Sequence, residues 1–154
     1  LSVCTFLKDR KVAERQANAA RKYLMKKGYF ADIEIVNDES NPSQKGSSLV
    51  LWTITDTDAI LGTDAIGELG KPSEDVGIEA AEKLVNEMSS KPTVDYHLAD
   101  ILIPYLALAE GNSGYLTRSV SEHLETNIWL TEKILDVEFK VERMNGVFMV
   151  RRVT

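Results

Sequence analysis

Apolar residues recur along this chain with two periods, and the change between them marks the expected elements. Alternating or continuous apolar runs predict strands at residues 2–7, 32–35, 49–55, 59–61 and onward, 115–120, 137–141 and 147–150. Apolar residues three or four positions apart predict helices at about residues 10–27, 73–88, 96–109 and 123–135. The predicted order is β-α-β-β-β-α followed by α-β-α-β-β.

Residues with special backbone preferences refine this outline. Asp9 and Gly28 are expected to cap the first helix, and Pro104 is expected to kink the third because it cannot donate a backbone hydrogen bond. The polar stretch at residues 37–48 predicts a loop. Asn145-Gly146 predicts a two-residue turn between the last two strands.

A break at residues 89–92 divides the pattern in two. The predicted boundary gives one unit at residues 1–92 and a second at 93–154. Sheets covered on one face by paired helices suit both units, so the expected fold class is α+β with two-layer units on mostly four-stranded sheets.

Composition limits the class of protein. At 154 residues with 44% hydrophobic and 27% charged residues, the chain is expected to fold as a globular protein. It contains no apolar run near the ~20 residues of a membrane span, which predicts no membrane association and a cytoplasmic location. Cys4 is the single cysteine, so it forms no internal disulfide, and a small buried hydrophobe is the expected role.

Charge is distributed unevenly. The net charge is −6, but residues 1–30 contain eight basic and two acidic groups, so they sum to +6 and the remainder to −12. A basic segment on an acidic protein is typical of a local contact with a polyanion such as RNA. A solvated helix face with no partner explains the same residues equally well.

The candidate chemistry centres on two histidines, His97 and His123. His123 falls in the expected first turn of a helix, where unpaired N–H groups attract phosphate and disfavour a protonated imidazole. A neutral imidazole there can attack phosphorus. The alternative is an exposed or packing histidine with no catalytic role.

Other sites are not favoured by the residues. The glycines at 62–67 have neither the lysine of a P-loop nor GxGxxG spacing. Asp56 and Asp58 are typical of a turn rather than of a metal site. Two histidines and no clustered cysteines predict no zinc site, and no residue is assigned as a metal ligand.

Six segments in order resemble the C-terminal part of the RNA 3′-terminal phosphate cyclases. They are SLVLW at 48–52, GTDAIG at 62–67, VGIEAAEKL at 76–84, HLAD at 97–100, PYLALA at 104–109 and HLETN at 123–127. The resemblance implies that residues 1–92 form most of a small inserted α/β domain. It also implies that residues 93–154 belong to a main body built from repeated two-helix, four-strand units.

In this family, a histidine matching His123 takes AMP from ATP. The resemblance implies that AMP then passes to an RNA 3′-phosphate and that a 2′,3′-cyclic phosphate forms, with Mg²⁺ or Mn²⁺ as the divalent metal. Asp100 is assigned to orient His123 or to bind ATP, and His97 to stack near the adenine. Ile101 stands in the nucleotide site where family members commonly have Gln.

The family's N-terminal half, with its acidic metal contact and phosphate-binding arginines, has no counterpart here. This half is therefore expected as a partner, and the 154-residue chain alone is expected to fold at least in part, to self-associate through residues 93–154 and not to cyclise RNA. Two alternatives remain. One is a non-catalytic cyclase-like ribosome-assembly factor, which is expected to lack His123; the other is an RNA-binding module that uses the basic helix.

Overall fold

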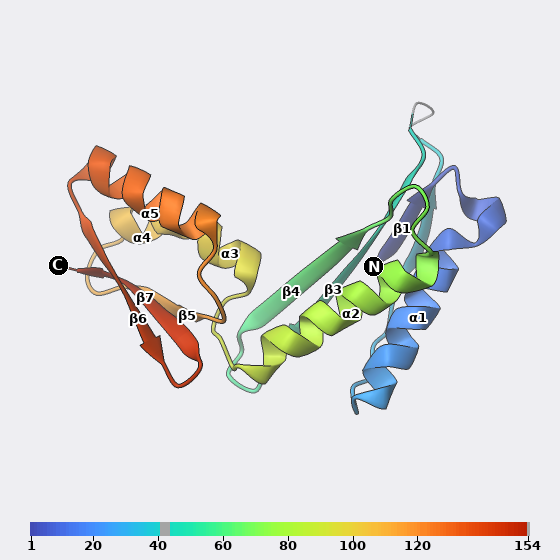
Figure 1. The fold of residues 1–154 in the computed structure, drawn as a ribbon, viewed down its shortest axis with the longest axis horizontal. Helices are drawn as coiled ribbons and strands as arrows, with labels where there is room; N and C mark the ends of the chain where they lie inside the picture. Colours follow the sequence, from blue (N-terminus) through green and yellow to red (C-terminus); the bar gives the residue numbers. More distant parts are fainter. Residues whose placement is uncertain (41–43, 154) are drawn as a thin grey trace. The chain divides into compact units, whose positions relative to one another are not determined.

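The computed structural model describes residues 1–40 and 44–153, which form two compact units (Figure 1). Unit 1 contains Leu1–Thr53 and Gly62–Asn86, and unit 2 contains Ile54–Leu61 and Glu87–Thr154. Helices and two separate sheets confirm the expected α+β class.

The sheet of unit 1 has the strand order β2-β1-β3-β4. Strand β1 (Ser2–Thr5) pairs in parallel with β2 (Ile35–Asp38) and antiparallel with β3 (Gly46–Ile54), and β4 (Ile60–Ile66) forms the other edge. The central position of β1 buries Cys4, as expected for a small hydrophobe.

Helices α1 (Val12–Lys26) and α2 (Ser73–Ser89) pack on one face of this sheet (Figure 1). Hydrogen bonds link sheet and helices, from Ser2 Oγ to the Ala13 carbonyl and from Thr63 Oγ1 to the Ala80 carbonyl. The two helices approach each other closely at Gly77, where a Cβ would lie 2.2 Å from the Gln16 carbonyl oxygen. A larger residue at this position would push the helices apart.

The other face of this sheet is open. Along β3, Leu49 and Leu51 are buried, whereas Val50 and Trp52 are exposed. Successive side chains of a strand point to opposite faces, so the buried pair faces the helices and the exposed pair faces away.

Unit 2 has a three-stranded antiparallel sheet within the part of the chain that the structure describes. The order is β5 (Gly114–Thr117), β7 (Val147–Val153) and β6 (Glu138–Met144). Its helices are α3 (Tyr96–Ile101), α4 (Ile103–Leu108) and α5 (Glu122–Leu135). The core between them contains mainly apolar side chains: Val94, Ala99, Ile103, Leu106, Tyr115, Leu124 and Val150.

The helix is interrupted where the kink near Pro104 is expected, although Leu102 keeps a helical backbone conformation. The predicted helix at 96–109 is two short helices joined at Leu102, and Pro104 lies in the first turn of α4. A proline is tolerated there because the first N–H groups of a helix have no intrahelical acceptor.

The first helix differs from its prediction at its start. Asp9 is not the cap, because it lies in a short 3₁₀ turn (Lys8–Arg10), and Lys11, with φ of 50°, precedes α1. The C-terminal end of this helix agrees better with the prediction. Lys27 is the C-cap, and Gly28 follows with φ of 84° while the Tyr29 N–H donates to the Leu24 carbonyl. This arrangement favours glycine because the left-handed conformation strains other residues.

Two further predictions are corrected in unit 1. The strand expected at 32–35 lies at Ile35–Asp38, and the loop expected at 37–48 is shorter because β3 already begins at Gly46. Residues 41–43 of that loop lie outside the described residues. Polar Ser47 and Ser48 belong to β3 because they pair with Cys4 and Val3 of β1.

The prediction of a two-residue turn is confirmed. The turn between β6 and β7 is formed by Asn145 and Gly146, both with positive φ (48° and 90°). In the described part of the chain, no helix combines the length and the apolar character that crossing a membrane requires.

Candidate functional site

His123 lies in the first turn of α5, as the sequence predicts. Ser121 caps this helix, and its Oγ accepts a hydrogen bond of 2.9 Å from the Leu124 N–H. The cap satisfies one of the N–H groups that a helix start leaves without an intrahelical partner. His123 is exposed, so its ring is accessible at the positive end of the helix.

Asp100 is tied to the same helix start. The Ser121 hydroxyl donates to Asp100 Oδ1 at 2.5 Å, and the Asn127 side chain donates to the Asp100 backbone carbonyl at 2.8 Å. Ser121 therefore accepts from α5 and donates to α3 at once. These bonds fix the end of α3 against the first turns of α5.

The carboxylate of Asp100 thus contacts the cap of the His123 helix. Within the described residues, its side chain bonds to Ser121, and no hydrogen bond joins it to His123. The arrangement fits a group that positions the turn containing His123. The predicted roles of Asp100, to orient His123 or to bind ATP, stay predictions.

Tyr115 lies beneath this contact. Its hydroxyl donates to the Ala99 carbonyl at 2.6 Å. The pKa of Tyr115 is raised well above its ordinary value, mainly because the ring is buried and secondly because the negative charge of Asp100 lies nearby. Tyr115 therefore remains a protonated donor and supports the backbone next to Asp100.

His97 occupies the first turn of α3. The Asp95 carboxylate caps that helix by accepting from the backbone N–H of His97 at 3.1 Å and of Leu98 at 2.8 Å. The His97 ring lies edge-on to Tyr96, with 5.3 Å between ring centroids. Its predicted stacking on adenine stays a prediction.

A hollow of about 510 Å³ opens beside Asp100. Ile101, 58% exposed, contributes to its wall, so an apolar side chain stands where the resemblance expects Gln. The remaining lining residues are mostly apolar side chains from α4 and α5: Pro104, Tyr105, Leu130, Ile134 and Leu135, together with Asn127 and Thr131. The structure thus places Asp100 and Ile101 in one hollow, whose lining includes neither histidine.

Sequence reasoning assigned no role to Ser121 or Asn127. A signal exists for Ser121, because serine immediately before a helix is a preferred N-cap. Its second bond, to Asp100, joins residues 21 positions apart and has no local signal. The Asn127 contact spans 27 positions in the same way.

The site offers no ready metal centre. Across residues 1–40 and 44–153, no group of three or more His, Cys, Asp or Glu side chains is arranged to hold a metal ion. The divalent metal implied by the resemblance stays a prediction.

Comparison with known proteins gives one family for the chain. The model of the RNA 3′-terminal phosphate cyclase (RTC) insert domain matches residues 1–89. RNA 3′-terminal phosphate cyclases are also similar over most of the chain: the protein from Pyrobaculum neutrophilum is 45% identical over 141 residues, 90% of this chain and 40% of the relative. That from Methanosarcina barkeri is 47% identical over 136 residues, 88% of this chain and 39% of the relative.

The chain spans about 40% of the length of these curated relatives. The matches cover unit 1 through the insert-domain model and extend, through the relatives, over nearly all of the sequence. The chain belongs to the RNA 3′-terminal phosphate cyclase family.

Proposed function

We propose that this chain supplies the nucleotide-accepting histidine of an ATP-dependent RNA 3′-terminal phosphate cyclase, and that this residue is His123. The observation that supports the proposal most is the exposed ring of His123 in the capped first turn of α5. The N-terminus of a helix attracts phosphate groups, so the phosphates of ATP would be drawn toward the ring of His123.

The proposed reaction has three displacements. A ring nitrogen of His123 attacks the α-phosphorus of ATP, forming a phosphorus–nitrogen bond as the bond to pyrophosphate breaks. An oxygen of the RNA 3′-phosphate then takes AMP from the histidine. Finally, the adjacent 2′-hydroxyl loses its proton and attacks the 3′-phosphorus, which releases AMP and leaves a 2′,3′-cyclic phosphate. ATP supplies the driving force, and covalent catalysis divides a difficult condensation into simpler steps.

The neighbouring residues have positioning and binding roles in this proposal. Asp100 holds Ser121, and Ser121 fixes the turn that presents His123. His97 stacks on adenine, and Ile101 gives the nucleotide site an apolar contact in place of an amide. A divalent ion would be held mainly by the phosphates of ATP, whose charge it would partly neutralise.

Catalysis is proposed to need more than these two units. The greater part of each relative lies outside the region matched by this chain. We infer that the corresponding segment supplies further phosphate-binding groups. It would also cover the apolar side chains that α4 and α5 expose beside the hollow.

Labelling with ATP radiolabelled at the α-phosphate tests the proposal. The 154-residue chain is joined to the unmatched segment of the Pyrobaculum neutrophilum relative, incubated with ATP, and the labelled residue is mapped. We expect an acid-labile adduct on His123 that His123→Ala abolishes.

His97→Ala is the matched control because it removes the other histidine. It should require more ATP but still accept label at saturation. Label on a lysine, or full labelling of His123→Ala, would refute the assignment. A complete absence of label would favour the alternative of a non-catalytic relative.

A further inference from the structure

Unit 1 presents a set of cations that its own carboxylates do not neutralise. Of the eight basic residues among the first 30, Arg15 bonds to Glu74 at 2.6–2.7 Å and Arg21 bonds to the Ile33 carbonyl, with Asp32 at 4.0 Å. The other six have no carboxylate at ion-pair distance in the described part of the chain: Lys8, Arg10, Lys11, Lys22, Lys26 and Lys27. By contrast, Lys71 and Lys83 of the same unit both pair with Glu79.

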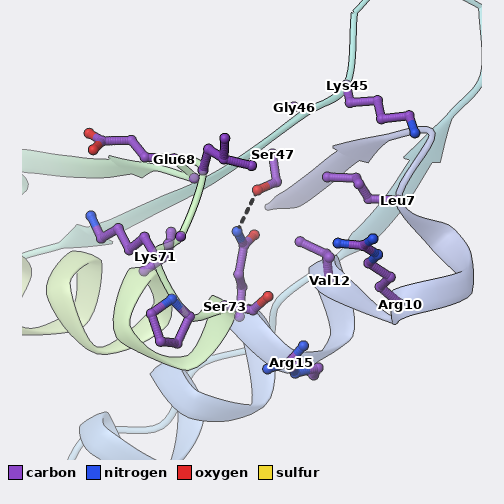
Figure 2. A pocket seen from close by; sticks show the side chains of 16 residues that line it. Leu7, Arg10, Val12, Arg15, Lys45, Gly46, Ser47, Glu68, Lys71 and Ser73 are labelled. Carbon is purple, nitrogen blue, oxygen red and sulfur yellow. Dashed lines mark hydrogen bonds between the residues drawn. The ribbon is translucent and has the colours of Figure 1, made fainter.

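One of these six cations, Arg10, borders a hollow of about 660 Å³ (Figure 2). Its wall contains four basic residues (Arg10, Arg15, Lys45 and Lys71) and a single acidic one, Glu68. Two of the four, Arg15 and Lys71, are already paired with Glu74 and Glu79, so Arg10 and Lys45 are the cations that this wall adds. Ser73, the first residue of the 17-residue helix α2, also lines it, so the positive end of that helix adds to the field. The chain as a whole is acidic, so this attraction for anions is local.

A second hollow of about 410 Å³ continues from the first along α1. Arg15 lines both hollows, and the second adds Lys22 and Lys26 together with the ring of Tyr23. Its only acidic residue, Glu74, is already bonded to Arg15. The cations thus follow the 15 residues of α1, a length of about 22 Å, which exceeds the size of a single phosphate group.

Aromatic side chains lie at the far end of this path. Immediately after Gly28, which follows the cap of α1 at Lys27, Tyr29 is 44% exposed and Phe30 is 92% exposed. An exposed aromatic ring beside lysines is typical of surfaces that stack on unpaired bases. The cations alone would serve an acidic protein equally well, whereas the rings add the flat faces on which unpaired bases stack.

We propose that the surface formed by the two hollows, α1 and Phe30 binds single-stranded RNA, with the cations on its phosphates and the aromatic rings on its bases. The choice of RNA as the polyanion rests on the proposed function, whereas the charged surface itself does not. This site lies within unit 1 and shares no residue with the site around His123.

Binding of a fluorescein-labelled single-stranded RNA of about ten nucleotides to the 154-residue chain, followed by anisotropy over a range of salt, tests the proposal. The double variant Lys22→Glu, Lys26→Glu should bind at least about tenfold more weakly at about 50 mM salt. It should also reduce the steepness of log K against log salt by about 1.4, since each phosphate contact on a single strand contributes about 0.7.

Two matched variants separate the parts of the proposal. Lys133→Glu, Lys140→Glu changes the net charge equally but lies in unit 2, and it should bind RNA nearly as the parent chain does. Phe30→Ala should weaken binding about tenfold with an unchanged salt slope, because stacking releases no counterions. Circular dichroism on each variant confirms that α1 remains folded, and Lys→Gln versions at 22 and 26 replace the Glu versions if it does not.

Three results would each contradict a different part of the proposal. Equal weakening by both charge-reversal pairs would show that net charge alone governs binding, and no binding at low salt would refute the site. Competition by polyglutamate as effective as by RNA, with Phe30→Ala unchanged, would assign the surface to an acidic protein. The RNA-binding assay contains no ATP, so its result does not depend on adenylylation at His123. Conversely, a loss of RNA binding would not decide whether His123 accepts the label.

Discussion

The outward faces of α1 and α5 differ in a way that separates the two units. Both helices pack one side against their own sheet. On its other side, α1 presents charged side chains such as Lys22 and Lys26, whereas α5 presents Trp129, 59% exposed, and Ile134, 68% exposed. A helix that is apolar on more than its core face is expected to be covered on both sides.

The helix α4 shows the same property as α5. Tyr105 and Leu108 are both mostly exposed and, with the apolar hollow, extend the uncovered surface. Unit 1 therefore has a helix layer suited to water and ions, while the helix layer of unit 2 is suited to an apolar partner. The comparison predicts different behaviour for the two surfaces in the isolated chain.

The largest expected effect concerns this apolar surface. We predict that the 154-residue chain self-associates through unit 2 and that Leu130→Glu, Ile134→Glu makes it monomeric. Both side chains line the hollow beside Asp100, and a buried carboxylate without a partner is costly. Association in the micromolar range corresponds to about 8 kcal/mol. Light scattering across a concentration series measures the mass directly.

Lys133→Glu is the control for charge, since it changes the net charge by the same amount on the same helix. It should leave the self-associated mass unchanged. A monomeric parent chain at all concentrations would show that the apolar surface of unit 2 does not cause association.

The next prediction, with the second largest effect, tests whether the two units have separate cores. Leu124 is fully buried in the core of unit 2, so Leu124→Ala should cost about 3–4 kcal/mol through lost burial and a cavity. Hydrogen exchange should report faster opening in α5 and β7 but unchanged protection of β1 and α1. Equal loss of protection in both units would mean that the chain unfolds as one.

A smaller effect concerns the bond that ties α3 to α5. Ser121→Ala removes the cap of α5 and the partner of Asp100, so it should destabilise unit 2 by about 1–2 kcal/mol. A double-mutant cycle with Asp100→Asn, followed by urea unfolding, isolates the contact between the two side chains. Additive effects of the two substitutions would show that the Ser121–Asp100 hydrogen bond adds no stability.

Local signals explain which parts of the fold could be predicted. The Asn145-Gly146 turn, the glycine after α1 and the break near Pro104 all depend on the backbone preferences of one or two residues. The position of β2 depends instead on its pairing with β1, which brings polar Asn37 opposite Cys4. Apolar alternation gives no information about such a partner, so the predicted strand was three residues too early.

In the candidate site, too, some features could be predicted from local signals and others could not. The place of His123 in a first helical turn follows from the apolar spacing of α5. The bonds of Asp100 to Ser121 and Asn127 could not be predicted, because they join residues 21 and 27 positions apart and depend on how α3 packs against α5. The roles of these residues in nucleotide transfer remain proposals that only the labelling experiment tests.

The smallest expected effect concerns the ion pairs on the surface of unit 1 and their contribution to its stability. Glu79 on α2 pairs with Lys71 and Lys83, and hydrogen bonds from the Lys71 and then the Lys83 ammonium lower the pKa of its carboxyl below the usual 4.5. These groups are partly exposed, so solvent screens the pairs and Glu79→Gln should cost only a few tenths of a kcal/mol at pH 7.

The sign of the pH dependence follows from the lowered pKa. The ionised form is favoured in the folded state, so the stabilisation is present above pH 4.5 and disappears as the pH falls through the lower pKa of the folded protein. The difference in unfolding free energy between the parent and Glu79→Gln should therefore shrink in acid. Urea titrations at neutral and acidic pH measure it, with exposed Glu82 on the same helix as the Glu→Gln control. A difference in unfolding free energy that persists undiminished in acid would assign the effect to packing. A large difference at pH 7 would mean that the charged helix layer stabilises unit 1 as well as offering its free cations to a ligand.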